Sequence, residues 1–310
     1  MPSTPALTGR AREGRILVTG AAGFLGRHLV RALHAQGLDV LAVDNLCVPP
    51  VEAPPDDLLC ASVLDLTAED LRGVTCIYHL SAWKSVPDSF SHPYRCVENV
   101  RAGEHVLRLA RAAGVARVVV ASSCEVYGTT QTPTREDAPL APRSAYAMSK
   151  AAVDCLAAVV RRGGQDVTVA RLFNVYGPGE RPDAVVPAFC QGALVKGEIV
   201  VEGSGRQRRD FSYVTDIVAR LVELSLVETC PAIVNLGSGT SHTILELSSW
   251  MTRRRPETTI TFGPERPLEI EEFRADTALA DALFTASDPV GLEAGLEETF
   301  SWWEWYADRV

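Results

Sequence analysis

The sequence predicts an α/β fold with a doubly wound parallel sheet and a smaller C-terminal α/β region. Two features of the pattern support this fold class. From residue 15 onward, short apolar runs alternate with longer segments of helical periodicity, as in proteins built from strand–helix–strand units. The apolar runs are continuous stretches of Val, Ile and Leu, which is typical of strands covered by helices on both faces.

The first half of the chain has the more regular pattern. Strands are expected at 15–19, 39–43, 74–78, 117–121 and 167–172. Helices are expected at 24–36, 94–113 and 145–161. After residue 174 the pattern loosens into loops at 176–182 and 203–209, with shorter helices and strands. The aromatic segment 300–306 has helical spacing, and we expect it to cover a core or, alternatively, to contact a second copy.

We expect three parts along the chain. Residues 1–14 are polar and contain Pro and Gly, which predicts a flexible tail. Residues 15–176 together with 210–240 form the larger predicted domain, and residues 177–209 together with 241–310 form the smaller one.

Composition and charge exclude several classes of protein. The 310-residue chain is 46% hydrophobic and 22% charged, which is typical of globular proteins and unlike a disordered chain. Its formal net charge of −9 argues against nucleic-acid binding. No apolar run approaches the roughly 18 residues of a membrane span, and the N-terminus lacks the apolar core of a signal peptide. The eight cysteines form no Cys-x-x-Cys pair, so we expect free thiols, no metal site and a cytoplasmic protein.

The first expected strand leads into a glycine-rich turn of sequence Gly20-Ala-Ala-Gly23-Phe24-Leu25-Gly26. Glycines in such a turn permit a tight bend and a close approach of the backbone to a pyrophosphate. The helix that follows offers N–H groups and the positive end of its dipole to the phosphates. The turn therefore predicts a dinucleotide site formed by these residues, with a sharp turn that binds nothing as the alternative.

An acidic residue ends the next expected strand. Asp44 follows Gly20 after 24 residues, and a carboxylate there accepts a hydrogen bond from the adenine-ribose 2′-hydroxyl and repels a 2′-phosphate. Neither Arg nor Lys occurs at 45–48. The sequence therefore favours NAD over NADP as the cofactor.

A second motif predicts catalytic chemistry. The segment Tyr146-Ala-Met-Ser-Lys150 places a phenol and an ammonium one turn apart on one helical face. The ordinary pKa of tyrosine is about 10, and a nearby positive charge favours the phenolate, so Tyr146 could act as a base near neutral pH. Ser123 follows the strand expected at 117–121, where ligands of open parallel sheets bind. We therefore predict Ser123, Tyr146 and Lys150 as catalytic residues.

Together these motifs resemble the extended short-chain dehydrogenase/reductase family, in particular its NAD-dependent nucleotide-sugar epimerases and dehydratases. The resemblance runs from Ile16 to about Ala280 and includes Arg171-Leu-Phe-Asn-Val-Tyr-Gly177, Arg209-Asp-Phe-Ser-Tyr213 and Arg266-Pro-Leu-Glu269. It implies a Rossmann-type NAD-binding domain at 15–176 plus 210–240 and a nucleotide-sugar-binding domain at 177–209 plus 241–310. It also implies a UDP-sugar substrate and a homodimer.

The resemblance implies roles for further residues. Contacts to the cofactor are implied for Asn45, Asp65, Leu66, Leu80, Ser81, Lys84 and Asn99. Contacts to the substrate are implied for Ser85, Asn174, Val185, Arg209, Arg266 and Glu269. The two arginines would hold a diphosphate, for which the guanidinium fork is suited, with a solvated surface charge as the alternative for each. The chain has Leu268 and Glu269 where the family usually has Gly and Asp.

The residues after Ser123 bear on the reaction. The resemblance implies that the sugar is first oxidised at C4, and a plain 4-epimerase needs no further base. Here the pair Cys124-Glu125 follows. The stretch 124–128, together with the stretches 84–87, 178–184, 207–211 and 272–279, resembles the tunicamycin-pathway UDP-N-acetylglucosamine 5,6-dehydratases. That resemblance implies that Glu125 removes H5, Cys124 protonates the departing C6 hydroxyl, and the hydride returns to C4, in antibiotic or nucleotide-sugar biosynthesis.

Several alternatives stay open at this point. The chain could be a UDP-hexose 4-epimerase with a structural Glu125, a 4,6-dehydratase or a decarboxylase of a uronic acid. Cys124 could be a small buried apolar residue, and Glu125 a carboxylate satisfied by backbone N–H groups or an arginine. A protein that binds NAD without catalysis is a further alternative, which the presence of both Tyr146 and Lys150 argues against.

Overall fold

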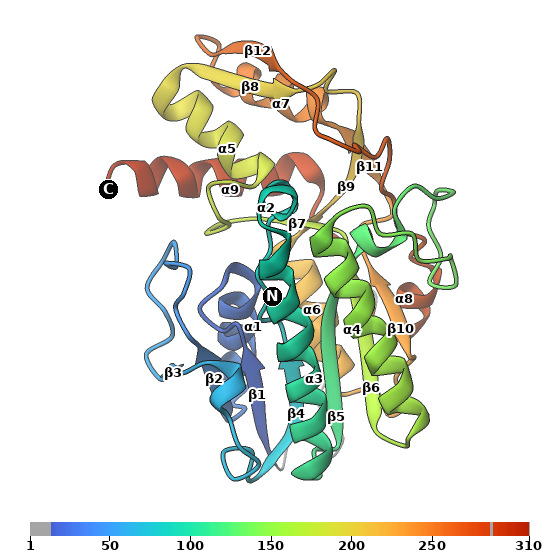
Figure 1. The fold of residues 1–310 in the computed structure, drawn as a ribbon. Coiled ribbons are helices and arrows are strands. Elements are labelled where there is room, and N and C mark those ends of the chain that lie inside the picture. The colour runs from blue at the N-terminus through green and yellow to red at the C-terminus, as the bar shows by residue number, and fades with distance from the viewer. Residues whose placement is uncertain (1–13, 286–287, 310) are drawn as a thin grey trace. The chain divides into compact units, whose positions relative to one another are not determined.

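The computed structural model describes residues 14–285 and 288–309 (Figure 1). The flexible tail expected at 1–14 therefore lies outside the described residues, apart from Gly14. By their packing the residues divide into two compact units. Among the described residues, the first unit contains 14–122, Ser144–Arg171 and Val218–Val234, and the second contains Ser123–Arg143, Leu172–Ile217, 235–285 and 288–309. The expected division into a cofactor-binding and a substrate-binding domain stays a prediction.

The main sheet has seven strands in the order β10-β6-β5-β4-β1-β2-β3. The strands are β1 (Arg15–Thr19), β2 (Val40–Asp44), β3 (Leu59–Cys60), β4 (Val74–His79), β5 (Arg117–Ser123), β6 (Asp166–Leu172) and β10 (Ile233–Leu236). β1 pairs in parallel with β2 and β4, so that Ile16 lies opposite Val40 on one side and Cys76 on the other. The strand order reverses at β1, as in Rossmann-type sheets, and the predicted fold class is confirmed.

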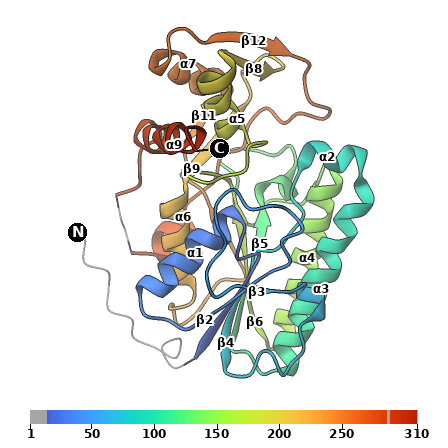
Figure 2. The same ribbon diagram turned by 90° about the vertical axis from the view of Figure 1, so that its left-hand side faces the viewer.

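Helices cover both faces of this sheet. α1 (Phe24–Ala35) and α6 (Val214–Leu224) lie over one face, and α3 (Cys96–Ala112) and α4 (Ala145–Arg162) over the other (Figure 2). The short segments η2 (Val63–Asp65), α2 (Val86–Ser91) and η3 (Pro93–Arg95) lie in the connections. Ile16, Val18 and Ile77 have no exposed surface, which explains why their strands are continuous apolar runs.

The second unit contains two small sheets. One has the order β11-β9-β7, formed by β7 (Asn174–Tyr176), β9 (Arg208–Tyr213) and β11 (Ser241–Thr243). The other is a parallel pair of β8 (Glu198–Glu202) and β12 (Thr259–Gly263). The helical segments are η4 (Cys124–Tyr127), α5 (Val185–Gln191), η5 (Gly192–Lys196), α7 (Ile244–Arg254), α8 (Ala278–Leu283) and α9 (Leu292–Ala307).

The C-terminal helix α9 covers a core of the second unit, as expected for the segment 300–306. Phe300 and Trp303 are buried, and the Phe300 ring meets the ring of Trp250 edge to face at 6.0 Å. Aromatic side chains contribute large buried areas, so this contact fixes α9 against α7.

The prediction of a loop at 203–209 is wrong for the last two residues, because Arg208 and Arg209 begin β9. Arg208 pairs with Thr243 and Arg209 with His242, both on β11. The Arg208 N–H also donates a hydrogen bond to the carbonyl of Glu271 at 2.7 Å. These partners lie far along the chain, so the local pattern of charged residues could not reveal the strand.

All eight cysteines lie within the described residues as free thiols. Cys76, Cys124 and Cys190 are among those that are buried, whereas Cys47 and Cys60 are exposed. Within residues 14–285 and 288–309, no helix combines the length and the apolar character needed to cross a membrane.

Candidate active site

The structure explains two glycines of the turn that follows β1. Gly20 has φ of 73°, and a Cβ there would lie 2.7 Å from the backbone nitrogen of Ser81. A Cβ on Gly26 would lie 2.0 Å from the carbonyl oxygen of Gly20. Gly23 caps α1 without a side-chain hydrogen bond, and the helix begins at Phe24. A helix start of this kind provides N–H donors and partial positive charge, which fit the phosphates of a dinucleotide.

Asp44 links the end of β2 to the glycine turn. One oxygen of its carboxylate accepts a hydrogen bond from the Ala22 N–H at 3.1 Å, and the other accepts one from the Leu46 N–H at 2.9 Å. The side chain of Asn45 accepts a hydrogen bond from the Cys47 N–H at 3.1 Å. A carboxylate has about four acceptor positions, so Asp44 retains capacity for a ribose hydroxyl.

Four further residues predicted to contact the cofactor lie in the first unit and differ in their exposure to solvent: Leu25, Asp65, Leu66 and Leu80. Asp65 is exposed at the end of η2, and the next residue, Leu66, is buried. The carbonyl of Leu66 lies 3.0 Å from Nε2 of His105 on α3. Leu25 and Leu80 are half-buried. The turn at 65–66 is therefore attached to α3 through its backbone.

Ser81 belongs to a polar group at the ends of β1 and β4. The hydroxyl of Thr19 donates to the Ser81 hydroxyl at 3.1 Å and lies 2.9 Å from Nδ1 of His79. Burial, together with the charge of Lys150, lowers the pKa of His79 to about 3, so its imidazole is neutral at physiological pH. Lys84, three residues after Ser81, is exposed.

Asn99 on α3 holds the segment between β4 and α2. Its side-chain oxygen accepts the Trp83 N–H at 2.8 Å, and its side-chain nitrogen donates to the Trp83 carbonyl and the Ser149 hydroxyl, both at 3.0 Å. This buried amide therefore ties the backbone next to Lys84 to α4, the helix that carries the predicted catalytic pair. A direct contact of Asn99 with the cofactor stays a prediction.

Tyr146 and Lys150 lie together on the buried face of α4. Nζ of Lys150 is 6.0 Å from the centroid of the Tyr146 ring and donates a hydrogen bond to the Ala121 carbonyl at 2.9 Å. Burial lowers the pKa of Lys150 to about 8, while Asp154 raises it and Lys84 lowers it. An ammonium at this place favours the phenolate of Tyr146.

Ser123 ends β5 and begins the turn η4. Its hydroxyl accepts a hydrogen bond from the Glu125 N–H at 3.2 Å, which caps the turn. Cys124 is buried and Glu125 is half-buried. Tyr127, at the end of the turn, donates from its hydroxyl to the side-chain oxygen of Asn235 at 2.7 Å, so the turn is fixed at both ends.

The environment of η4 suits acid–base chemistry. Burial raises the pKa of the Cys124 thiol well above its ordinary value, and the neighbouring Glu125 raises it further. Burial also raises the pKa of Glu125, while Arg209 and Arg266 lower it and Glu269 raises it. At neutral pH the thiol therefore stays protonated, although it is a weaker acid than an exposed thiol, and the carboxylate becomes a stronger base.

Both predicted diphosphate-binding arginines form ion pairs with carboxylates. Arg209 pairs with Glu269, and its Nη1 donates to the carbonyl of Ile270 at 2.8 Å. The Arg209 side chain is only 12% exposed, which argues against a solvated surface charge. Arg266 pairs with Glu202, and these side chains are 40% and 44% exposed, respectively.

The remaining predicted substrate residues lie on three elements. Ser85 caps α2, since its hydroxyl accepts the Asp88 N–H at 3.2 Å. Asn174 begins β7, and its side-chain oxygen is buried without a hydrogen-bond partner among the described residues. Such an acceptor requires a partner, which a sugar hydroxyl could provide. Val185 begins α5 and is half-buried.

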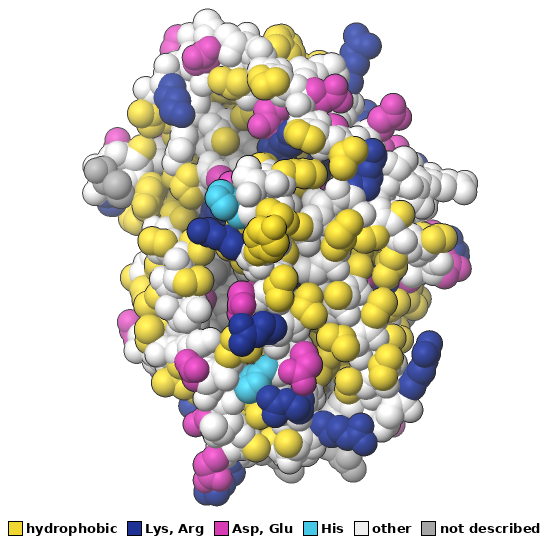
Figure 3. All heavy atoms as spheres, in the orientation of Figure 1, with side chains coloured by type: hydrophobic (Ala, Val, Ile, Leu, Met, Phe, Trp, Pro, Cys, Tyr) yellow, Lys and Arg dark blue, Asp and Glu magenta, His cyan; other side chains and the backbone are white. Residues whose placement is uncertain are grey.

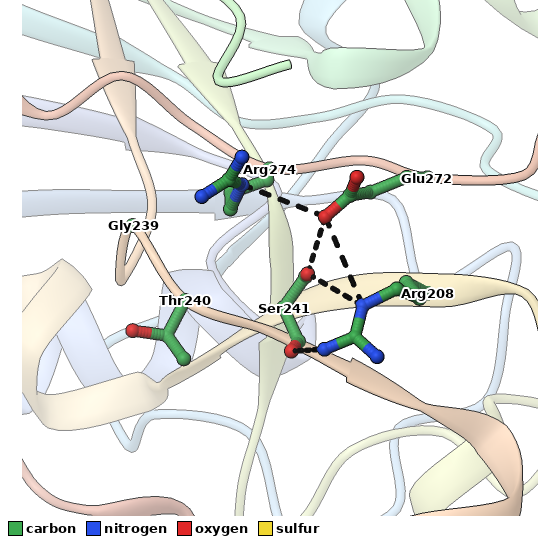
Figure 4. Close-up of a pocket in the computed structure, with 6 residues that line it drawn as sticks. All are labelled: Arg208, Gly239, Thr240, Ser241, Glu272 and Arg274. Carbon is green, nitrogen blue, oxygen red and sulfur yellow. Dashed lines mark hydrogen bonds and ion pairs between the residues drawn. The ribbon is translucent and has the colours of Figure 1, made fainter.

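The second unit also has a polar pocket of about 390 Å³ that the sequence analysis did not single out (Figure 4). Its lining residues are Arg208, Gly239, Thr240, Ser241, Glu272 and Arg274. Nε of Arg208 donates to the Ser241 hydroxyl at 3.0 Å, and Nε of Arg274 lies 3.5 Å from the Glu272 carboxylate. Two guanidinium groups thus share one carboxylate, and these contacts join β9, β11 and the segment 272–274.

Two buried residues near Lys150 were given no role in the sequence analysis. Asp154 follows Lys150 by four residues on α4, and Arg171 lies on β6. Nε of Arg171 is 3.0 Å from the Asp154 carboxylate. The helical spacing of Tyr146, Lys150 and Asp154 is the signal that could have revealed the acid. Among the residues described by the structure, no group of three or more potential metal ligands comes together.

The parallel sheet has a glycine-rich turn after β1, and α4 places the phenol of Tyr146 beside the buried ammonium of Lys150. These features define the class of NAD-dependent short-chain dehydrogenases/reductases. The chain belongs to the NAD dependent epimerase/dehydratase family, whose model matches residues 16–237. It is an enzyme of the branch that acts on nucleotide sugars as epimerases, dehydratases or decarboxylases.

Three relatives illustrate this branch. A solved structure described as a novel NAD-dependent NDP-hexosamine 5,6-dehydratase, TunA, involved in tunicamycin biosynthesis, is 45% identical with a TM-score of 0.91, over 94% of this chain and 97% of that chain. UDP-glucuronic acid decarboxylase 1 of Danio rerio is 33% identical over 93% of this chain and 72% of its own length. UDP-glucuronate 4-epimerase of Thermodesulfobacterium geofontis is 29% identical over 93% and 96%, respectively.

The cofactor of the enzyme is NAD. The residues present fit it: the tight turn at Gly20 precedes a helix without a side-chain cap, and the carboxylate of Asp44 ends β2. The resemblance to the extended short-chain dehydrogenase/reductase family is therefore confirmed.

Proposed function

We propose that the protein is an NAD-dependent 5,6-dehydratase of a UDP-hexose similar to UDP-N-acetylglucosamine. The observation that carries this proposal is the pair of Cys124 and Glu125 in the capped turn after β5, both with raised pKa values. A plain epimerase has no use for such a pair. The similarity to a relative described as an NDP-hexosamine 5,6-dehydratase supports the same reaction.

The first role falls to the residues of α4 and β5. NAD, held by the glycine turn and Asp44, would supply the hydride acceptor for C4 of the sugar and the donor for the same carbon at the end of the reaction. Tyr146 takes the proton of the C4 hydroxyl as a phenolate that the Lys150 ammonium stabilises. Ser123 donates a hydrogen bond to the same oxygen. Asp44 and the glycine turn hold the cofactor's ribose and phosphates.

The second role falls to Cys124 and Glu125. A ketone at C4 makes H5 acidic, and the Glu125 carboxylate takes it as a proton. The C5–C6 double bond forms as the C6–oxygen bond breaks, and the Cys124 thiol donates its proton so that the hydroxyl leaves as water. The carboxyl proton of Glu125 restores the thiol, and Tyr146 returns its proton to the C4 oxygen. The net change is loss of one water molecule.

The substrate is bound through residues of the second unit in this proposal. Arg209 and Arg266 exchange their partners Glu269 and Glu202 for the diphosphate. Glu269, released from Arg209, accepts hydrogen bonds from the uridine ribose. The unpartnered side-chain oxygen of Asn174 accepts a hydrogen bond from the sugar.

The test is incubation of the enzyme with NAD and UDP-N-acetylglucosamine in deuterated water, followed by proton NMR. We expect loss of the H5 signal and the appearance of two vinyl protons on C6. A mixture of C4 epimers that retain H5 would contradict the proposal. A product with a 6-methyl group and a C4 ketone would assign a 4,6-dehydratase instead.

Epimerase and decarboxylase activities are the specific alternatives, since relatives of both kinds align along more than nine-tenths of this chain. UDP-glucuronic acid discriminates them from the dehydratase. A decarboxylase releases carbon dioxide from it, and a 4-epimerase converts it to UDP-galacturonic acid. We expect neither product.

We also propose that the enzyme acts as a homodimer through α3 and α4. Tyr94, Val97, Met148 and Val159 lie on or beside these helices and are 54% exposed or more. Hydrophobic side chains gather over this region of the surface (Figure 3). Exposed apolar patches of this kind mark protein interfaces. Light scattering after gel filtration tests the proposed dimer. We expect a dimeric mass for the wild type and a monomeric mass for Val97→Asp. A dimeric mass for the variant would contradict this interface.

A further inference from the structure

The buried face of α4 carries three chemically active residues at intervals of four. Tyr146, Lys150 and Asp154 are 9%, 7% and 4% exposed, respectively. Residues four apart on a helix are neighbours on its surface. The proposed mechanism uses Tyr146 and Lys150 but leaves Asp154 without a role.

Asp154 is held by a second buried charge. Its carboxylate lies 3.0 Å from Nε of Arg171 on β6, and the side chains of both residues are 3% exposed. Burial raises the pKa of Asp154, while the hydroxyl of Ser122 and the charges of Arg171 and Lys150 lower it. A buried ion pair adds little to stability compared with apolar side chains of the same volume, so stability alone does not explain this pair.

The charges that face Lys150 come from several elements. Asp154 on α4 attracts its ammonium, and Lys84, in the segment before α2, repels it. His79 on β4 also faces Lys150 but is neutral, since its pKa is lowered to about 3. The Ala121 carbonyl on β5 adds a neutral acceptor. Asp154 therefore supplies a counter-charge in a place where burial and Lys84 both oppose the ammonium.

We propose that Asp154, fixed by its ion pair with Arg171, is a positioning residue that keeps Lys150 charged beside Tyr146. Its importance for catalysis rests on the proposed function of Tyr146 and Lys150. The electrostatic effect on Lys150 itself does not, and it can be measured without any turnover.

The sequence permits a direct measurement, because the chain contains only three lysines: Lys84, Lys150 and Lys196. Protein labelled with ¹³C at lysine Cε gives three signals, and Lys84→Arg and Lys196→Arg assign them. In Asp154→Asn the Lys150 pKa should fall by about one pKa unit, a tenfold loss of proton affinity. Asp154→Glu should restore most of it, and the exposed control Asp39→Asn should leave it unchanged.

The unpaired Arg171 could prevent Asp154→Asn from folding, so a second variant is needed. Asp154→Asn combined with Arg171→Met removes the guanidinium that would otherwise be left without its carboxylate, and Lys150 keeps its hydrogen bond to the Ala121 carbonyl, so this variant should fold. The Lys150 pKa should again lie below the wild-type value. An unchanged Lys150 pKa in either folded variant overturns the proposal and makes the pair purely structural.

The pH dependence of kcat tests whether the charge of Lys150 matters for catalysis. If Lys150 must be charged, activity is lost as pH rises through its pKa, so Asp154→Asn should move the alkaline limb of kcat to lower pH. A lowered Lys150 pKa together with an unmoved limb would contradict the positioning role. If the chain makes no 5,6-ene, the NMR titration still decides the electrostatic part of the proposal independently.

Discussion

The hydroxyl of Ser123 accepts a hydrogen bond from the backbone N–H of Glu125 at 3.2 Å. The residue that ends β5 thus fixes the turn that presents the thiol and the carboxylate of the next two residues. A short, capped turn of this kind restricts the position of both side chains. The serine predicted to contact the substrate is therefore also the residue that holds the proposed elimination pair.

Replacing Cys124 by Ala should separate the two halves of the elimination. Glu125 would still remove H5 after C4 oxidation, so deuterium should enter C5 from deuterated water. Without the thiol the C6 hydroxyl leaves slowly, and formation of vinyl protons should fall by about 100-fold. NMR measures both signals in one sample. The exposed Cys155→Ala is the control, and vinyl formation at the wild-type rate in Cys124→Ala would show that the thiol is dispensable.

The raised pKa of Glu125 predicts the pH dependence. A carboxylate base works only when deprotonated, so activity is lost as pH falls through its pKa. Because burial raises this pKa, the acid limb of kcat/KM should lie above the ordinary Glu value of about 4.3. Arg209 opposes the increase, so Arg209→Met should move the limb to still higher pH. Rates of vinyl formation across pH measure it, and an unmoved limb in the variant would argue against Glu125 as the base.

Asp44 should discriminate between the two dinucleotides. Loss of hydrogen bonds to a charged group costs about 1.5–3 kcal/mol, so Asp44→Ala should weaken NAD binding by roughly 10- to 100-fold. NADP binding should not weaken, because the repulsion of its 2′-phosphate is removed as well. Calorimetric titration with both cofactors measures the difference. An equal loss for NAD and NADP would mean that Asp44 only fixes the turn through the Ala22 N–H.

The local pattern predicted much of the first unit. The strand expected at 15–19 and the helix expected at 145–161 match β1 and α4 closely. Both are continuous apolar or amphipathic segments whose conformation follows from neighbouring residues. The helix expected at 94–113 instead starts as η3 and continues as α3 from Cys96.

Features set by distant residues could not be predicted in the same way. The pair of Arg209 and Glu269 joins residues 60 apart, and the start of β9 depends on β11. The burial of Asp154 depends on Arg171 across the unit. The motifs identified the chemical groups, whereas their partners and pKa values required the fold.

The backbone at Leu268, next to the predicted substrate residue Glu269, allows a stability test that does not depend on catalysis. Leu268 has φ of 56°, a left-handed conformation that costs Leu about 1–2 kcal/mol, and its side chain is 54% exposed. Leu268→Gly removes this strain but adds about 0.5–1 kcal/mol of conformational entropy cost. The free energy of unfolding in urea should therefore stay equal or increase by about 1 kcal/mol. A clear decrease would show that the Leu268 side chain has stabilising contacts.

The most direct test of the central claim is the Glu125→Gln variant assayed with UDP-N-acetylglucosamine in deuterated water. The amide cannot remove H5, so we expect vinyl formation and deuterium entry at C5 to fall by about 100- to 10,000-fold. The exposed control Glu293→Gln should retain wild-type rates. A Glu125→Gln enzyme that forms the 5,6-ene at close to the wild-type rate would contradict the account.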